Sequence, residues 1–110
     1  MFLEDKLQVI LFEYLQGEKD ANQATDDMLN ACINHIAERT KDGMKVKDVA
    51  AVIEQTDKIW RTFAKKNLPN SGDVFFESYI KPRILDHPNA NQGLKNYFSK
   101  KLNRQWTILF

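Results

Sequence analysis

Cysteine and histidine are scarce in this sequence. Cys32 is the only cysteine, so no internal disulfide can form, and the cysteine count gives no support for an oxidising compartment. The two histidines, His35 and His87, leave too few ligands for a structural zinc site. Because Cys32 and His35 both fall on the apolar stripe of one predicted helix, we interpret them as a buried thiol and a partly buried imidazole. No metal ion and no cofactor are expected.

Glycine is also infrequent, and its four occurrences are isolated. They never form the GxGxxG or GxxxxGK loops that bind phosphate groups. The Glu-x-x-His tetrapeptides of carboxylate-bridged di-iron bundles are missing as well. Asp26 and Asp27 are adjacent acids, but they lie in the first turns of a predicted helix, where the helix dipole accounts for them. The sequence therefore predicts no catalytic residues, and we expect a protein that is not an enzyme.

Long apolar runs are absent too. The first residues include the acids Glu4 and Asp5, where a secretory signal needs basic residues. Gln8 and Glu13 interrupt the apolar stretch that follows, which is too short to cross a membrane. We therefore expect neither a targeting nor a membrane-spanning segment, and a cytoplasmic location.

The residues that are present are those of a globular protein. Of the 110 residues, 43% are hydrophobic and 28% are charged, and seven Phe, three Tyr and two Trp supply large side chains for a core. This length is typical of one domain and too short for two independent cores. A single domain over residues 1–110 is predicted.

Residues 2–16 have the spacing of a helix with one apolar side, and Gly17 ends it. That side consists of Leu3, Leu7, Ile10, Leu11 and Tyr14. Val9 and Phe12 point elsewhere on the same helical projection, so the helix is apolar around more of its circumference than a surface helix needs. We expect this helix either at the centre of the bundle or in an interface between proteins.

Two further helices follow in the first two thirds of the chain. The second begins at a capping box, in which Asp20 is the cap and Gln23 stands three residues later, and it stops near Gly43. The third covers about residues 46–66, where apolar residues again recur with helical spacing.

The last two predicted helices are separated by a proline-containing turn. The fourth begins after the turn-forming residues 68–73, and a kink or break is expected near Pro82. The fifth begins at a second capping box, with Asn89 as the cap. Only the tail of residues 106–110 resembles a strand. The predicted fold class is all-α, a compact bundle of four to five helices with short loops.

The net charge of +1 conceals an asymmetry along the chain. Residues 1–57 carry six basic and twelve acidic residues, a balance of −6, and residues 58–110 carry ten basic and three acidic residues, a balance of +7. Such a distribution is typical of chains that bind nucleic acid, bind an acidic protein or associate head to tail. It is equally compatible with two halves that attract each other on folding.

The segment from about 46 to 66 allows two interpretations. As one helix it places Thr56 and Asp57 beside the apolar stripe, which is an awkward interruption. As two helices, with Thr56 or Asp57 as a second N-cap, it resembles a helix-turn-helix. Its second helix carries Lys58, Arg61 and Lys65 on one side, with Lys58 and Arg61 facing the major groove of DNA. Glu54 departs from that motif, because glycine usually makes the turn. We favour one long helix with a solvated basic face.

Two functions follow from these patterns. The first is a small, non-enzymatic helical interaction or regulatory module that binds a protein partner or another copy of itself. The alternative is nucleic-acid binding through the basic C-terminal half. Candidate interface residues for the first function are Val9, Phe12, Trp106, Ile108, Leu109 and Phe110. Candidate contacts to nucleic acid or an acidic partner are Lys58, Arg61, Lys65, Lys100, Lys101 and Arg104.

Overall fold

The described part of the structure, a computed structural model, comprises residues 2–68 and 76–99, and its regular structure is entirely helical. The α-helices are α1 (Leu3–Leu15), α2 (Ala21–Arg39), α3 (Val46–Trp60) and α4 (Phe76–Leu85); η1 (Arg61–Lys65) is a π-helix, and residues 92–99 form a further helical segment. The predicted all-α bundle is confirmed. The predicted strand-like tail lies outside the described residues.

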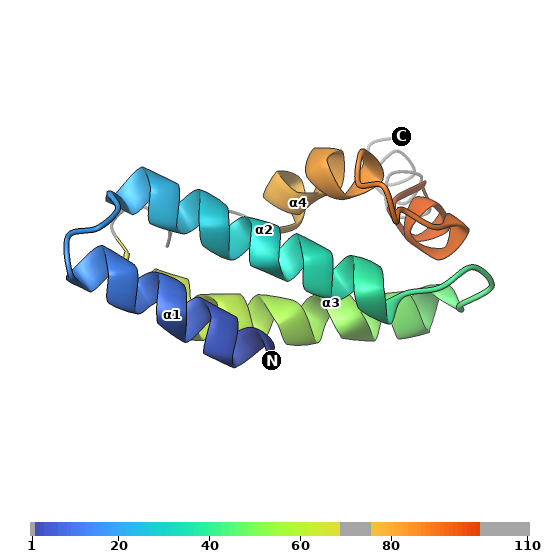
Figure 1. Ribbon diagram of the computed structural model, residues 1–110. Coiled ribbons are helices and arrows are strands. Elements are labelled where there is room, and N and C mark those ends of the chain that lie inside the picture. Colours follow the sequence, from blue (N-terminus) through green and yellow to red (C-terminus); the bar gives the residue numbers. More distant parts are fainter. Residues whose placement is uncertain (1, 69–75, 100–110) are drawn as a thin grey trace, which may run out of the picture.

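Helix α2 is the central element of the bundle. Figure 1 shows α1, α2 and α3 running side by side, with the chain reversing direction at each connection. Helix α4 covers another side of α2, so that α2 contacts α1, α3 and α4. This position explains why α2 buries residues along its whole length, from Ala24 to Ala37.

The connection between α1 and α2 is built by two local motifs. Gly17, at φ +80°, follows α1, and the Glu18 N–H donates to the Glu13 carbonyl at 2.9 Å while the Gly17 N–H donates to the Tyr14 carbonyl at 3.0 Å. These are the two hydrogen bonds of a Schellman motif, which satisfies the last carbonyls of the helix. Asp20 then caps α2, because its Oδ1 accepts from the Gln23 N–H at 2.8 Å.

The capping box predicted at Asp20 is only half formed. The Gln23 side chain does not return to the cap; its Nε2 donates to Asp27 Oδ1 at 2.8 Å instead. In a capping box the Gln23 Oε1 would accept from the Asp20 N–H, whereas here the amide donates from its Nε2 to the negatively charged carboxylate one turn further along the helix, a charge-assisted hydrogen bond.

Residues 46–65 form one continuous helical segment, so the turn required by the helix-turn-helix interpretation is absent. Thr56 is buried and its Oγ1 donates to the Val52 carbonyl at 2.7 Å, within the same helix. The hydroxyl that looked like an N-cap therefore bonds backwards by one turn. At Arg61 the α-helix passes directly into the wider π turn of η1.

The break expected as one alternative at Pro82 does not occur, because helix α4 continues through the proline and ends at Leu85; the other alternative, a kink, stays a prediction. The predicted cap of the last helix was wrong. The final helical segment begins at residue 92 and is capped by Asn91, whose Oδ1 accepts from the Leu94 N–H at 3.1 Å, rather than by Asn89.

Asn89 belongs to a turn that is organised by His87. The Asn89 N–H donates to His87 Nδ1 at 3.0 Å, and the Ala90 N–H donates to the His87 carbonyl at 2.9 Å. The opposite ring nitrogen, Nε2, lies 2.8 Å from Asn34 Oδ1 on α2. Because these bonds hold Asn89 in a turn, the last helical segment begins two residues later than predicted.

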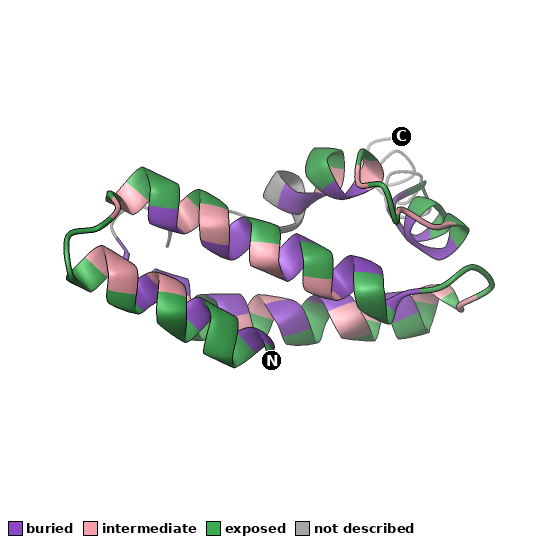
Figure 2. Ribbon diagram, viewed as in Figure 1, coloured by how far each residue is buried: buried purple, intermediate pink, exposed green. Residues whose placement is uncertain are grey.

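One connected hydrophobic core joins all the described helices. It contains Leu3, Leu7 and Leu11 of α1, Met28, Leu29, Cys32 and Ile36 of α2, Val49, Ile53 and Trp60 of α3, Ile80 and Ile84 of α4, and Leu94, Tyr97 and Phe98. Figure 2 shows these buried positions as stripes on the inward sides of the helices. The outward side of α1 differs from those of α2 and α3, because it carries large exposed apolar side chains.

Candidate functional site: the outer face of α1

Large exposed apolar side chains gather at α1. Phe2, which precedes the helix, is 72% exposed, Val9 50%, Phe12 58% and Leu15 68%. Among the residues whose side chains the structure describes (2–64, 66–68 and 80–99), no other large apolar side chain is exposed to this degree. Single exposed apolar residues are common on proteins, whereas several on one short helix form a candidate binding surface.

The α-helical repeat explains why these residues are exposed. Leu3, Leu7 and Leu11 recur every four residues and occupy the face that packs on the core. Val9 and Phe12 fall on the opposite side at 3.6 residues per turn, so packing α1 onto the bundle leaves them in solvent. We call the exposed side chains of Phe2, Val9 and Phe12 the outer face of α1; Leu15 lies at its edge.

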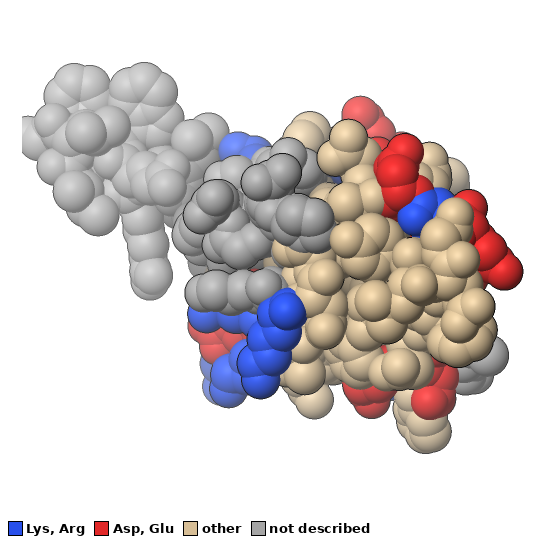
Figure 3. All heavy atoms as spheres, turned by 90° about the vertical axis from the view of Figure 1, so that its left-hand side faces the viewer, with Lys and Arg blue, Asp and Glu red and all other residues tan. Residues whose placement is uncertain are grey.

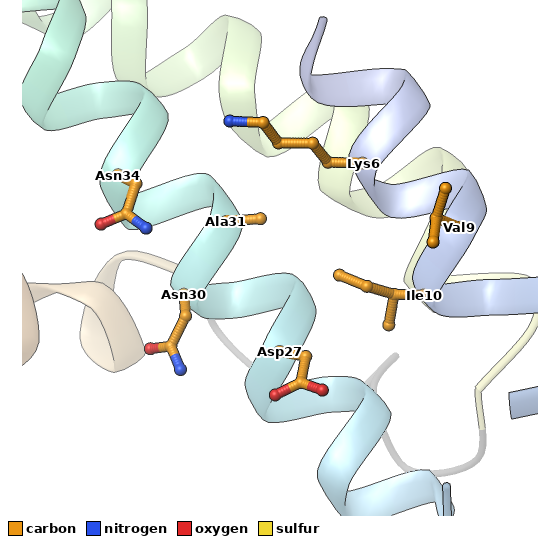
Figure 4. Close-up of a pocket in the computed structure, with 7 residues that line it drawn as sticks. All are labelled: Lys6, Val9, Ile10, Asp27, Asn30, Ala31 and Asn34. Carbon is orange, nitrogen blue, oxygen red and sulfur yellow. The ribbon is translucent and has the colours of Figure 1, made fainter. Parts of the chain in front are cut away.

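An open groove of about 430 Å³ adjoins this face between α1 and α2. Its lining residues are Lys6, Val9, Ile10, Asp27, Asn30, Ala31 and Asn34. In Figure 4, Ile10 and Ala31 point toward each other across the gap, and Lys6 extends over it toward α2. The groove is open because the Ala31 side chain is small. Ile10 and Ala31 form its apolar floor, and polar side chains of both helices border it. Val9 belongs to both the groove and the outer face, so the two form one surface.

A charged cluster fixes the helix connection at one end of this surface. Lys19 Nζ lies 2.6 Å from Asp27 Oδ2 and 3.4 Å from Glu13 Oε2, and so bridges α1 and α2. The hydrogen bond from Lys19 lowers the pKa of Asp27, and the same bond raises the pKa of Lys19. The cluster therefore holds the two walls of the groove together without filling it.

The predicted thiol and imidazole on α2 lie in different surroundings. Cys32 is fully buried, and burial raises its pKa to about 12. His35 is partly buried, which lowers its pKa. This is the arrangement that the sequence predicted. A thiol with such a pKa is protonated at neutral pH and is a poor nucleophile.

Charged side chains surround a broad uncharged area at one end of the bundle. In Figure 3, which looks at this end, acidic side chains lie at the top, upper right and bottom of the uncharged area, and basic side chains gather mainly at its lower left. Some charges also pair across the fold: Arg83 lies 3.4 Å from Asp26, which joins the basic half to the acidic half. Both side chains are exposed, so this pair contributes little to stability.

Of the predicted basic contact residues, the structure describes the side chains of Lys58 and Arg61 alone. Lys58 is exposed, and Arg61 is exposed but forms an ion pair with Asp57 at 2.9 Å. The side chain of Lys65 and residues Lys100, Lys101 and Arg104 lie outside the described part. The same holds for the predicted interface residues Trp106, Ile108, Leu109 and Phe110.

The structure adds residues that the sequence did not indicate. Asn30, Ala31 and Asn34 line the groove from α2, yet on a helical projection they are ordinary polar or small positions. Only the packing of α1 beside α2 brings them next to Val9. Exposure of Val9 and Phe12, in contrast, follows from their positions on the helical projection.

Two kinds of site do not occur among the described residues. No three His, Cys, Asp or Glu side chains there come together as ligands of a metal ion. Within the same part of the chain, no helix has the length and apolar character needed to span a membrane.

Comparison with known proteins gives no relative. The chain matches no protein-family model, no curated protein and no solved structure. The interpretation of the site therefore depends on its own geometry.

Proposed function

We propose that this chain is a small helical interaction module that binds a protein partner through the outer face of α1 and the adjoining groove. The observation that carries the proposal is the exposure of Val9, Phe12 and Leu15 on a single helix and of Phe2 directly before it. Transfer of apolar surface out of water is the main driving force of protein association.

The composition of this surface fits an interface. Binding energy is usually concentrated in a few aromatic side chains surrounded by less important contacts, and two of the four exposed residues are phenylalanines. The groove beside them has an apolar floor at Ile10 and Ala31 and a polar edge at Asn30 and Asn34. This combination of apolar centre and polar rim is the usual anatomy of a protein interface.

Site-specific photo-crosslinking tests the proposal. A photoreactive amino acid replaces Phe12 in the full chain, and the matched control places it at Ala51, an exposed position on α3. Both variants are irradiated in the cells that naturally produce the protein. We expect a discrete protein adduct from position 12 and none from position 51.

A second substitution tests whether formation of the adduct depends on the outer face of α1. Val9→Ser should reduce crosslinking from position 12 several-fold, because it removes apolar area from the same surface without disturbing the core. Equal adducts from positions 12 and 51, or none from position 12, would contradict the proposal.

A second candidate function, electrostatic binding of nucleic acid, is favoured by the balance of +7 in residues 58–110 and by exposed Lys58. Neutralising phosphates releases counterions, so binding of a random DNA duplex should weaken steeply with salt. Fluorescence anisotropy with Lys58→Glu should show a salt slope lowered by about 1, whereas Lys47→Glu on the acidic half serves as the control. Absence of binding at low salt would remove this candidate.

A further inference from the structure

We infer that the partner of the outer face of α1 is the same helix of a second copy, packed antiparallel about a two-fold axis. The inference rests on the proposed function and names its partner. Three observations support it: the position of opposite charges on α1, the position of Phe12 on one flank of the helix and the area that is exposed.

The charges on α1 select the antiparallel direction. Lys6 and Glu13 are seven residues, or two helical turns, apart, and they lie on the same side of the helix as Val9. In an antiparallel pair centred between Val9 and Ile10, Lys6 of each copy lies opposite Glu13 of the other. A parallel pair would instead place each Lys6 against its own counterpart. The two-fold arrangement is therefore the one with complementary charges.

The same two-fold axis brings the apolar parts of the surface together. Phe12 lies on the flank of α1 that faces away from the groove. In the antiparallel pair the two-fold axis is perpendicular to both helices, so the Phe12 flanks of the two copies lie on the same side of the pair. The two Phe12 rings then come within reach of each other, while the two grooves with their Ala31 floors open on the other side. The two-fold axis thus brings the apolar flank of each copy beside the same flank of the other.

The exposed area indicates how strong the association is. If a large apolar side chain offers about 150–200 Å², the exposed fractions of Phe2, Val9, Phe12 and Leu15 together amount to roughly 400–500 Å² per copy. A stable interface of standard size needs about 800 Å² per partner, so these side chains supply roughly half of that area. We therefore expect a weak, reversible dimer.

Sedimentation velocity of the full chain between about 1 and 500 µM tests the inference. We expect the average mass to rise with concentration toward twice that of the chain. Phe12→Ser should remain monomeric throughout, and Lys47→Glu, an exposed change on α3, should behave as wild type. Far-UV circular dichroism of each variant verifies that the helices are intact.

A charge exchange tests the direction of the pair. Lys6→Glu alone should weaken dimerisation about tenfold, because it opposes two pairs of like charges. Glu13→Lys alone should do the same, and because it also removes the contact with Lys19, Glu13→Gln provides a milder second variant. The double variant Lys6→Glu/Glu13→Lys should recover most of the wild-type affinity. Failure of the double variant to recover would overturn the antiparallel geometry.

The outcomes separate this inference from the proposed function. A chain that stays monomeric at the highest concentration, together with a crosslink from position 12 to a different protein, overturns self-association and leaves the proposed function in place. A monomer without any crosslink overturns both. A dimer that is insensitive to Phe12→Ser also overturns the inference, because its interface then lies elsewhere.

Discussion

Cys32 and His35 are one helical turn apart on α2, but the packing of α1 and α3 around α2 separates their chemistry. Cys32 is enclosed by the core, whereas His35 lies at its margin. Burial disfavours the charged form of each group, so the pKa of the thiol is raised and that of the imidazole is lowered. The burial of Cys32 and His35 can therefore be tested one residue at a time.

Cys32 should react with thiol reagents only when the protein unfolds. Its thiol is both inaccessible and protonated, so labelling at neutral pH should be slower than that of a free cysteine by roughly the folding equilibrium constant, ~10³ or more. Labelling rates measured across a urea series should rise in step with the unfolded fraction. Rapid labelling without urea would show that this part of the core opens independently.

His35 should make stability depend on pH near neutrality. Its pKa in the folded protein lies below the ordinary value of 6.5, because of burial first and the neighbouring Arg39 second. Above pH 6.5 both states are neutral and the group has no effect. As the pH falls through 6.5 the unfolded state takes up the proton first, so the free energy of unfolding decreases until the pH passes the folded-state pKa.

Urea unfolding between pH 8 and pH 5 measures this effect. His35→Gln should flatten the decline, whereas Asp27→Asn should leave it unchanged and act at lower pH. The pKa of Asp27 is lowered from 3.8, so the stability it provides is present above that value and is lost as the pH falls through its folded-state pKa. A decline unaltered by His35→Gln would assign the neutral-pH dependence to another group.

At the scale of elements, helix ends determine where the bundle turns. Gly17 and Gly43 both have positive φ and both follow a helix, and a Cβ at either position would meet no atom within 4 Å. Their requirement for glycine is therefore conformational and not steric. The Schellman motif at Gly17 also directs the chain toward Lys19, whose ion pairs hold α1 beside α2.

Gly17→Ala should lower the free energy of unfolding by about 1 kcal/mol, the usual cost of a left-handed conformation for a residue with a Cβ. Gly17→Asn should cost less, because Asn tolerates this region better. Chemical denaturation of the two variants compares them. Equal destabilisation by both would indicate that the side chain itself, and not φ, is responsible.

At the scale of the whole molecule, the loop after α2 is joined to the start of the last helical segment. Thr40 Oγ1 donates to the Ile36 carbonyl at 2.9 Å and accepts from Asn91 Nδ2 at 2.9 Å. Asp42 Oδ1 accepts from the Gln92 N–H at 2.6 Å. These bonds cap the N-terminus of the last helical segment from the loop after α2. They connect residues 92–99 to α2, although the two are about fifty residues apart in sequence.

Gly93 is the position where this junction is closest. A Cβ there would lie 2.8 Å from the Lys41 carbonyl oxygen and 3.0 Å from Asn91 Oδ1. Gly93→Ala should therefore cost about 1–3 kcal/mol by forcing the two backbones apart, in spite of the better helix propensity of alanine. Lys95→Ala, at an exposed site on the same segment, is the control.

Hydrogen exchange locates the effect of Gly93→Ala. Faster exchange should be confined to residues 40–44 and 92–99 if the junction opens locally. Unchanged stability and exchange would show that the two segments can separate without cost.

The sequence by itself determined the helical class, because the 3.6-residue spacing of apolar residues in α1, α2 and α3 is long and regular. It also determined that Val9 and Phe12 lie away from the core, since their angular positions on α1 follow from the same spacing. The cap at Asp20 was likewise predictable, because a capping bond is made within one turn of the chain.

Tertiary structure decided what depends on contacts between distant residues. The groove exists only because Ala31 of α2 packs opposite Ile10 of α1, and no local pattern encodes that pairing. Thr56 became part of one helix, and not the cap of a second, because burial on the core side favours a bond to its own helix. The last helix begins after Asn91, and not after Asn89, because His87 holds Asn89 in a turn while Thr40 and Asp42 supply partners for Asn91 and Gln92. Local spacing fixes the helices and their faces, while burial and long-range hydrogen bonds fix their ends and the surfaces between them.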